Sequence, residues 1–597
     1  MGWTFIEGST DEVVSALAGV NIFSFDIETT GLNPFDSRIL LWQIGLPTKQ
    51  MYVIRASADV DKLLPFLGSS KWTKLIHNAK FEQKFIQYFT NTTIKGVFDT
   101  MLAEQVITSE KYPRSLDHLA LKYASIKVDK TLQKSFIGMH PQEMFTDEQL
   151  QYAATDVEIL FPIYEKQKEE LEKTGQSLIA RIESDCAGVV AAMELEGIPL
   201  DVDKWRNVLQ EYINQEHEKK QQIFSVLLDD SPLPEQQGLF ERAGINLKSP
   251  KQLAEAMLAI GIDLPQNTRG NYMTDERTLE KIKHPVAKDI LEYRGIVKII
   301  DAYGESFLDN IHPFTGRIHP DFHQIGAETG RFSCRDPNVQ QIPAKFRRLI
   351  GGLDDYVIVG ADYGQMELRI IAELSQDSAL IKAFELGGDP HASTAAQMFG
   401  IPLDKVSKDQ RHIAKTINFG LSYGMGVPKL MDMINAKSEK KLTFRDTDRI
   451  YKKYTETYAG VFRWFMDAGN AAYRRGYSET LGGRRRLFMR PAGGLPEREF
   501  SNQVAAIKRQ GGNAPIQGTN ADITKLALAT VYSDLSDYGY RAHIINAVHD
   551  EIILLAHKSQ TEEIREVVTD SMLRAAQELI KSVPVQVDSY ADQWWAK

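Results

Sequence analysis

Carboxylates in the first part of this sequence recur at spacings that suit divalent metal ions. In the segment FSFDIETTG, Asp26 and Glu28 are two residues apart on a predicted strand, so both side chains point to one face. In YAATD, Tyr152 and Asp156 are four residues apart on a predicted helix and also share a face. Each pair alone is typical of a solvated strand edge or helix surface. Together, their oxygens could hold two divalent ions that activate water and stabilise the leaving oxygen in phosphodiester hydrolysis.

A second set of carboxylates lies in the C-terminal half of the chain. The apolar segment YVIVGAD predicts a strand that ends at Asp362, and the following QMELRI predicts a helical turn that carries Glu367. In INAVHDEIIL, apolar runs on both sides of residues 549–551 predict a hairpin with Asp550 at its tip. An Asp at the end of a buried strand is often only a cap, but these carboxylates could also bind Mg²⁺.

The segment RHIAKTINFGLSYG places two cations and then two aromatic residues at four-residue intervals. Four residues turn an α-helix by about 400°, so these side chains drift by only about 40° per step and line one face. They are Arg411, Lys415, Phe419 and Tyr423. The cations could neutralise a triphosphate while the aromatic rings stack on a base. An amphipathic helix with an aromatic core stripe would explain the same pattern.

The first carboxylate set resembles the DEDD exonucleases, in their tyrosine-containing branch. The three motifs are DIET, HNAKFE and YAATD within about residues 20–165, supported by FDTMLA and SLDHLALKY. The resemblance implies an RNase H-like α/β domain that removes nucleotides from a DNA 3′ end with two metal ions. The implied metal ligands are Asp26, Glu28, Glu82 and Asp156, with Tyr152 orienting the attacking water. The second motif usually ends in Asp, so Glu82 predicts weakened proofreading.

The C-terminal part resembles the family A DNA polymerases. ADYGQMELRI and AVHDEI are similar to the two catalytic motifs of that family, and RHIAKTINFGLSYG is similar to its finger-helix motif. Four more matches keep the family's order: ETGRFSCRDPNVQQIP, GDPHASTAAQMFG, TLGGRRR and RQGGNAPIQGTNADITK. No 5′-nuclease segment precedes the exonuclease part, so we expect the layout of a polymerase I large fragment or of a phage-type enzyme.

The polymerase resemblance implies roles for individual residues. Two Mg²⁺ ions, which Mn²⁺ can replace, are expected on Asp362 and Asp550, with Glu551 in support. The residues expected to bind the incoming dNTP are His391, Arg411, Lys415, Phe419, Tyr423, Gln365 and Glu367, of which Glu367 would block a ribose 2′-OH. The residues expected to contact the minor groove of the primer–template are Arg331, Arg509, Asn513, Gln517 and His549. Acceptors occupy similar places in that groove for every base pair, which suits a sequence-independent enzyme.

These residues must be positioned by more than one domain, because 597 residues exceed what a single hydrophobic core usually serves. We expect an α/β fold with an RNase H-like exonuclease domain over 1–175, followed by a right-hand polymerase domain over 176–597. Its parts are expected to be a thumb at about 185–315, a palm at about 316–385 and 500–597, and fingers at about 386–499.

Local patterns predict some of the elements. Apolar runs at 22–27, 39–45 and 51–54 predict strands, and the charged stretch near 165–185 predicts a helix that joins the two domains. Ser249 before Pro250 predicts the start of a helix.

Charge is distributed unevenly along an acidic chain. The net charge is −10, but residues 411–490 hold 17 Lys and Arg against 7 Asp and Glu, so this stretch is +10 and the rest of the chain is −20. A basic stretch on an acidic protein suggests a groove for a polyanion. Primer–template DNA and dNTPs are the expected partners. We expect a monomer, and no motif identifies a processivity factor.

Other features exclude several protein classes. No window holds about 20 unbroken apolar residues, which argues against a membrane span, and the first residues do not resemble a leader, so we expect a bacterial or host cytoplasmic protein. The two cysteines, Cys186 and Cys334, are too far apart in the sequence for a zinc motif.

Three rival functions remain open at this point. A pure exonuclease would not need both Asp362 and Asp550 together with the Arg/Lys helix. A single-subunit RNA polymerase would not need Glu367 as a sugar gate. A non-enzymatic nucleic-acid-binding protein would be expected to lose its catalytic carboxylates, and only Glu82 departs from the motifs.

Overall fold

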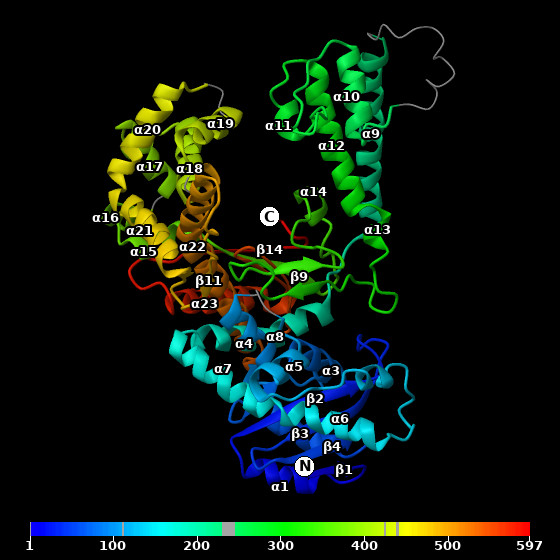
Figure 1. The fold of residues 1–597 in the computed structure, drawn as a ribbon. Helices are drawn as coiled ribbons and strands as arrows, with labels where there is room; N and C mark the ends of the chain where they lie inside the picture. Colours follow the sequence, from blue (N-terminus) through cyan, green and yellow to red (C-terminus); the bar gives the residue numbers. More distant parts are fainter. Residues whose placement is uncertain are drawn as a thin grey trace. The chain divides into compact units, whose positions relative to one another are not determined.

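The computed structural model describes residues 2–109, 113–229, 245–387, 389–422, 425–437 and 441–596 (Figure 1). The chain divides into two compact units. The larger unit comprises Met1–Gly197, Pro320–Gln340 and Asp355–Gln593. The smaller unit comprises Ile198–His319, Gln341–Asp354 and Trp594–Lys597.

The N-terminal part of the larger unit is built on a six-stranded mixed sheet. The strand order is β1-β4-β3-β2-β5-β6, and β3 runs antiparallel to both of its neighbours. The strands are β1 (Gly2–Ile6), β2 (Ile22–Thr29), β3 (Ile39–Gly45), β4 (Gln50–Arg55), β5 (Thr73–Ile76) and β6 (Val97–Asp99). The three predicted strands are confirmed as β2, β3 and β4.

Helices cover both faces of this sheet. They are α1 (Asp11–Ala18), α2 (Leu64–Leu67), α3 (Lys80–Thr90), α4 (Thr100–Thr108), α5 (Leu116–Leu119), α6 (Asp147–Glu158), α7 (Leu160–Thr174) and α8 (Ser177–Glu196). Helix α6 packs against β2, β3 and β4, and its residues share a core cluster with Leu41 and Val53. Residues from α1, α3, α4, α7 and α8 belong to the core cluster on the other face.

The alternation of side chains along β2 decides where the first carboxylates point. Phe23, Phe25 and Ile27 lie in the core cluster with α1 and α3. Successive side chains of a strand point to opposite faces, so Ser24, Asp26 and Glu28 face α6. The Ser24 hydroxyl donates a hydrogen bond to the backbone carbonyl of Val157 on α6, at 2.6 Å. The period of two therefore delivers two carboxylates to the face that α6 covers.

The expectation of one helix joining the two domains is wrong. Helix α7 ends at Thr174, and Gly175 has a φ of 73°, a left-handed conformation that glycine adopts without the steric cost of a Cβ. The Gln176 backbone N–H then donates to the carbonyl of Leu171 at 2.8 Å, which satisfies one of the last carbonyls of α7. Helix α8 starts afresh at Ser177.

The C-terminal part of the larger unit contains a four-stranded antiparallel sheet in the order β12-β13-β9-β14. Its strands are β9 (Tyr356–Tyr363), β12 (Ala542–Val548), β13 (Glu551–His557) and β14 (Val587–Asp592). The predicted strand before Asp362 is confirmed as β9. The predicted hairpin is confirmed as β12 and β13, with His549 and Asp550 in its turn.

The remaining elements of this unit are mostly helices, together with two short hairpins. The helices are α15 (Met366–Ser375), α16 (Ser378–Glu385), α17 (Pro390–Phe399), α18 (Lys408–Ser422), α19 (Val427–Lys437), α20 (Phe444–Thr457), α21 (Ala459–Arg475), α22 (Glu497–Asp537) and α23 (Thr561–Gln577). The hairpins pair β7 (Asp321–His323) with β8 (Ser333–Arg335) and β10 (Tyr477–Glu479) with β11 (Arg485–Leu487). Helix α22 alone contains 41 residues.

The smaller unit is helical in its described residues. Its helices are α9 (Val202–Asp229), α10 (Pro250–Ala259), α11 (Glu276–Leu279), α12 (Pro285–Tyr303), α13 (Glu305–Leu308) and α14 (Ala344–Arg347). Ile223, Met257 and Ile290 belong to one core cluster of this unit. The predicted start of α10 is confirmed, because the Ser249 hydroxyl accepts a hydrogen bond from the Gln252 backbone N–H. Among the described residues, none of the helices of either unit is long and apolar enough to cross a membrane.

Candidate active sites

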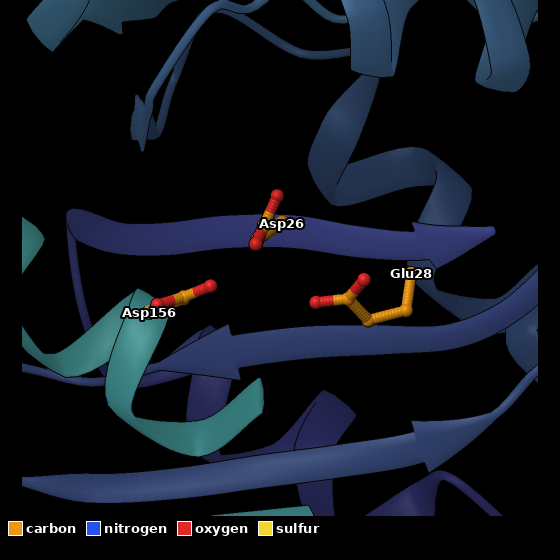
Figure 2. Close-up of side chains that lie close together, drawn as sticks. All are labelled: Asp26, Glu28 and Asp156. Carbon is orange, nitrogen blue, oxygen red and sulfur yellow. The ribbon is translucent and has the colours of Figure 1, made fainter. Parts of the chain in front are cut away.

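Three carboxylates of the N-terminal domain converge as the sequence predicts. Figure 2 shows Asp26 and Glu28 on β2 and Asp156 on α6, with their carboxylates turned toward a common space. One oxygen from each lies within 4.8 Å of the others, which is the spacing of a group that could hold a metal ion. Helix α6 also carries Tyr152, which lies one helical turn before Asp156. The strand and the helix thus bring all four predicted residues together.

Glu82 also reaches this cluster, from the first turn of α3. Its side chain is 2% exposed, and the charge of Asp26 helps to raise its pKa, so the two carboxyl groups are neighbours. The Glu82 Oε2 and Asp156 Oδ1 atoms are buried without a hydrogen-bond partner among the described residues. Buried carboxylate oxygens without donors are costly, and a divalent cation would satisfy both of them. The residues present therefore fit a metal site.

Burial and mutual repulsion hold protons on this cluster in the absence of a cation. Burial raises the pKa of Asp26 to about 6. Burial, followed by the charge of Asp26, also raises the pKa of Glu28, Glu82 and Asp156 well above the usual range. The pKa of the Tyr152 hydroxyl rises too, first through burial and then through the charge of Asp156. Groups of like charge that crowd together in this way are typical of a site that is completed by cations.

The carboxylates lie at one side of a pocket of about 920 Å³. Its other walls include His77 and Asn78, which precede α3, and the 77% exposed Leu32. Lys130 and Lys134 line the pocket as well, so it combines an acidic floor with basic residues. A pocket of this size with both charges can accept the phosphodiester end of a nucleic-acid strand.

Asp99 supports this site and was not identified from the sequence. Its carboxylate accepts hydrogen bonds from the backbone N–H groups of Asn78 at 3.2 Å and Ala79 at 2.7 Å, directly before α3. It also accepts from the N–H groups of Met101 and Leu102, which caps α4. Asp99 therefore fixes the backbone that leads to Glu82. In the sequence, an Asp between a strand and a helix in FDTMLA indicates a helix cap. It does not indicate the contact with the backbone before α3.

The second carboxylate site lies on the C-terminal sheet. Asp362 is near the end of β9, Asp550 is in the β12–β13 turn, and Glu551 is the first residue of β13. Glu551 pairs directly with Asp362 across the strands. Burial, followed by the charge of Asp362, raises the pKa of Asp550 to about 7. Two carboxylates that lie close enough for the charge of one to raise the pKa of the other also fit a site for divalent cations.

The turn after β9 places Gln365 and Glu367 beside this pair. Gln365 has a φ of 52° at the start of α15, and Glu367 lies in the first turn of that helix. Glu367 forms an ion pair with Arg331, which the sequence predicted as a DNA contact. Its charge is one of the causes of the raised pKa of Asp550. The structure therefore brings Glu367 close to Asp550 and pairs it with Arg331.

The predicted dNTP residues lie mainly on α17 and α18. His391 is 3% exposed, and its Nδ1 atom lies 3.0 Å from the Asn418 side-chain nitrogen. Burial lowers the pKa of His391 to about 4, so the ring is neutral near pH 7. Arg411 and Lys415 are both on α18, and Arg411 forms an ion pair with Asp389.

Two of the predicted aromatic residues cannot be placed. Phe419 belongs to α18, but its side chain lies outside the described part of the structure. Tyr423 lies outside the described residues altogether. Their roles therefore stay predictions.

The remaining predicted DNA contacts lie on α22 and in the β12–β13 turn. Arg509, Asn513 and Gln517 follow one another at four-residue spacing on α22. Arg509 is exposed, and the other two are half-buried. His549 is exposed and has a φ of 58°, an uncommon conformation for a residue with a side chain. The turn therefore presents His549 to solvent next to Asp550.

Two family models match the chain. One, described as DNA polymerase family A, matches residues 231–597, and one described as 3′-5′ exonuclease matches residues 3–172. DNA polymerase I of Aquifex aeolicus is 31% identical, and the match covers 96% of this chain and 95% of that protein. DNA polymerase I of Chloroflexus aurantiacus is 30% identical over 98% of this chain, but the match spans only 62% of that protein.

A solved structure has the same fold. It is the POL domain of Pol1 from M. smegmatis in complex with DNA primer-template and dNTP. It matches with a TM-score of 0.81 at 25% sequence identity, and the match covers 99% of both chains.

Proposed function

Because this chain belongs to the family A DNA polymerases and carries a 3′–5′ exonuclease domain, we propose that its two carboxylate sites perform two separate reactions. The chain is a DNA-directed DNA polymerase with 3′–5′ exonuclease activity. The site on β9 and β13 performs synthesis, and the site on β2 and α6 performs degradation. The observation that carries this division is that each site assembles its own carboxylates from its own elements.

Synthesis is assigned to Asp362 and Asp550, which would hold two divalent cations, with Mg²⁺ as the natural ion and Mn²⁺ as a substitute. Such ions lower the pKa of the primer 3′-OH and brace the pyrophosphate leaving group. The effect of the Asp362 charge on the pKa of Asp550 supports a shared cation site, because it shows that the two carboxyl groups are neighbours. Glu551, paired with Asp362, supports the same site.

The incoming dNTP is assigned to the helices next to this site. Arg411 and Lys415 neutralise the triphosphate, and the neutral ring of His391 donates or accepts a hydrogen bond there. Phe419 packs on the sugar and base, and Tyr423 lies beside the template base. Gln365 borders the same position, and Glu367 excludes a ribose 2′-OH by crowding. The Arg331–Glu367 ion pair fixes Glu367 for this role.

Primer–template DNA is the proposed macromolecular partner, because the similar M. smegmatis structure is a complex with DNA primer-template and dNTP. The assigned contacts to the minor groove are Arg331, Arg509, Asn513, Gln517 and His549. The first two are cations that can also reach phosphates. The hydrogen-bond donors of these side chains can meet the minor-groove acceptors of every base pair, which a copying enzyme requires.

Proofreading is assigned to Asp26, Glu28, Glu82 and Asp156 as metal ligands. Tyr152 would orient the attacking water from its place one helical turn before Asp156 on α6. Glu82 is longer than the Asp usual at its position, yet it reaches the cluster and contacts Asp26. We therefore infer a working exonuclease with slowed or metal-selective turnover.

The proposed domains follow these roles. Residues 1–175 form the exonuclease domain, and residues 176–597 form the polymerase domain. Its thumb is at about 185–315, its palm at about 316–385 and 500–597, and its fingers at about 386–499. We further infer a monomer that acts in replication or repair in a bacterial or host cytoplasm.

Primer extension tests the proposal. The protein is incubated with a 5′-labelled primer on a defined template, with dNTPs or rNTPs, and with Mg²⁺, Mn²⁺ or EDTA. Template-directed extension with dNTPs and a cation is expected, together with 3′ shortening when dNTPs are withheld. If the primer is shortened but never extended under any condition, the proposed synthesis fails and only the proposed exonuclease activity stands. Extension with rNTPs as efficient as with dNTPs would contradict the role of Glu367.

A further inference from the structure

Tyr590 lies on the C-terminal sheet, two strands away from Glu551. Strand β14, which carries Tyr590, pairs with β9, and β9 pairs on its other side with β13. Tyr590 is opposite Gly360, and Asp588 is opposite Asp362. Paired residues point to the same face of a sheet, as do residues two apart along one strand. Tyr590 therefore lies on the face that carries Asp362 and Glu551.

Gly360 leaves the space that the Tyr590 ring occupies. A Cβ atom at Gly360 would lie 2.3 Å from the Cζ atom and 2.4 Å from the hydroxyl oxygen of Tyr590. Contacts this short do not occur between real side chains, so only glycine at this position lets the ring lie across β9. The ring thereby bridges from β14 to β13 over the strand that delivers Asp362.

The ring's hydroxyl group ends at a carboxylate of the active site. The Tyr590 hydroxyl donates a hydrogen bond to Glu551 Oε1 at 3.0 Å. Glu551 is 6% exposed, directly follows Asp550 and pairs with Asp362. A hydroxyl donor to a carboxylate fixes the rotamer of that side chain and is stronger than a hydrogen bond between neutral groups. A residue 39 positions further along the chain thus holds one carboxylate oxygen of Glu551.

We propose that Tyr590 is a positioning residue for nucleotide transfer, which acts by holding Glu551 in place beside Asp362 and Asp550. The inference rests on the proposed function, because it assumes that Glu551 supports the polymerase site. Tyr590 touches neither DNA nor dNTP in this role. Gly360 is its necessary partner, because a larger residue there would push the ring off β9.

The first test replaces only the hydroxyl group. Tyr590→Phe keeps the ring over Gly360 and removes the hydrogen bond to Glu551. We expect kcat for single-nucleotide insertion to fall by about five- to twentyfold while KM for dNTP stays within about twofold. The 3′–5′ exonuclease rate of the same preparation should be unchanged, which controls for folding and concentration. Insertion at the wild-type kcat would overturn the proposal.

A double-mutant cycle separates positioning from packing. In a Glu551→Ala background, Tyr590→Phe should have no further effect on kcat, because its target is gone. An equal fall in kcat with and without Glu551 would show that Tyr590 acts independently of Glu551 and would overturn the inference. If Glu551→Ala alone leaves kcat unchanged, the proposed role of Glu551 fails. If Glu551→Ala lowers kcat but Tyr590→Phe does not, only the inference about Tyr590 fails.

Gly360→Ala tests the second half of the pair. It keeps the hydroxyl group but displaces the ring, so it should lower kcat as Tyr590→Phe does. Because this variant can also disturb folding, it is paired with Gly360→Ala/Tyr590→Phe, in which the hydroxyl is already lost. The double variant should insert nucleotides no more slowly than Gly360→Ala. A further drop of the size seen for Tyr590→Phe alone would contradict a shared mechanism.

Discussion

The exonuclease carboxylates lie on a strand and two helices, whereas the carboxylates proposed for synthesis lie on the adjacent antiparallel strands β9 and β13 and in the β12–β13 turn. In the first site, β2 and α6 bring three carboxylates within 4.8 Å of one another, and Glu82 joins them from α3. In the second site, the register of β9 against β13 sets Asp362 opposite Glu551 and beside Asp550.

The two sites also differ in how the protein offsets their charge. Around the polymerase carboxylates, Tyr590 donates to Glu551 and Arg331 pairs with Glu367. In the exonuclease cluster, two buried carboxylate oxygens have no partner among the described residues, and burial raises the pKa of each carboxyl group. We infer that the exonuclease cluster relies on cations to satisfy its buried oxygens, whereas the supporting carboxylates Glu551 and Glu367 of the second site are held by protein groups.

Removing two carboxylates from the exonuclease cluster should have the largest effect on degradation. Asp26→Ala with Glu28→Ala removes two of the three converging side chains, so degradation of single-stranded DNA should fall by about 10³-fold, or ~4 kcal/mol. Primer extension by the same preparation should stay within about twofold. A variant at an exposed carboxylate of the same domain, Asp61→Ala, serves as the control and should retain both rates. A parallel loss of extension would show that the two sites are not independent.

Removing Glu367 should have a smaller effect that is confined to sugar choice. The Glu367 side chain is proposed to crowd the ribose 2′-OH, so Glu367→Ala should raise ribonucleotide incorporation relative to deoxynucleotide by at least about tenfold, equivalent to ~1.4 kcal/mol. The measurement is the ratio of kcat/KM for matched ribo- and deoxynucleotides. Because Arg331 loses its partner, Arg331→Met is assayed beside it. An unchanged ratio in Glu367→Ala would remove the residue from this role.

Substitutions at Glu82 test whether the exonuclease cluster needs a carboxylate at this position and how long its side chain must be. Glu82→Ala should lose most 3′ degradation, about tenfold or more, in both Mg²⁺ and Mn²⁺, because the site loses a carboxylate that contacts Asp26. Glu82→Asp should match or exceed the wild type if the extra methylene only mis-spaces the ligand. Equal rates for wild type, Asp and Ala would show that Glu82 is a bystander. No activity in the wild type with either metal would mean that the domain is a scaffold.

Acid should weaken the two metal sites unequally. When the pKa of a carboxyl group is raised, protons compete with cations for that group up to a higher pH. The competition ends as the pH rises above the pKa. The pKa of Asp550 is raised to about 7, whereas burial raises the pKa of Glu28, Glu82 and Asp156 together. From about pH 8 to about pH 6.5, the half-saturating Mg²⁺ concentration should rise about tenfold for degradation and about threefold for extension. A larger rise for extension would reverse the comparison.

Short-range patterns predicted the elements that carry the sites. The period of two along residues 22–29 and the four-residue step from Tyr152 to Asp156 needed only local geometry. The apolar runs around residues 549–551 likewise predicted their hairpin.

Sequence analysis did not predict features that depend on long-range strand pairing or on special backbone conformations. Tyr590 meets Gly360 only through the pairing of β14 with β9, which joins segments far apart in the chain. Asp99 was visible as a helix cap, but its second role toward Asn78 required the parallel register of β5 and β6. The helix break at Gly175 was not predicted, because the composition of the charged stretch favours helix on both sides of this glycine.

The central claim is that synthesis and degradation belong to separate carboxylate sites, and both rates measured on one polymerase variant test it most directly. Asp362→Ala and Asp550→Ala are each assayed for single-nucleotide insertion and for 3′ degradation in Mg²⁺, next to the wild type. We predict that insertion falls by about 10³-fold or more while degradation stays within about twofold. Insertion at the wild-type rate in either variant, or an equal loss of both activities in a folded protein, would contradict the account.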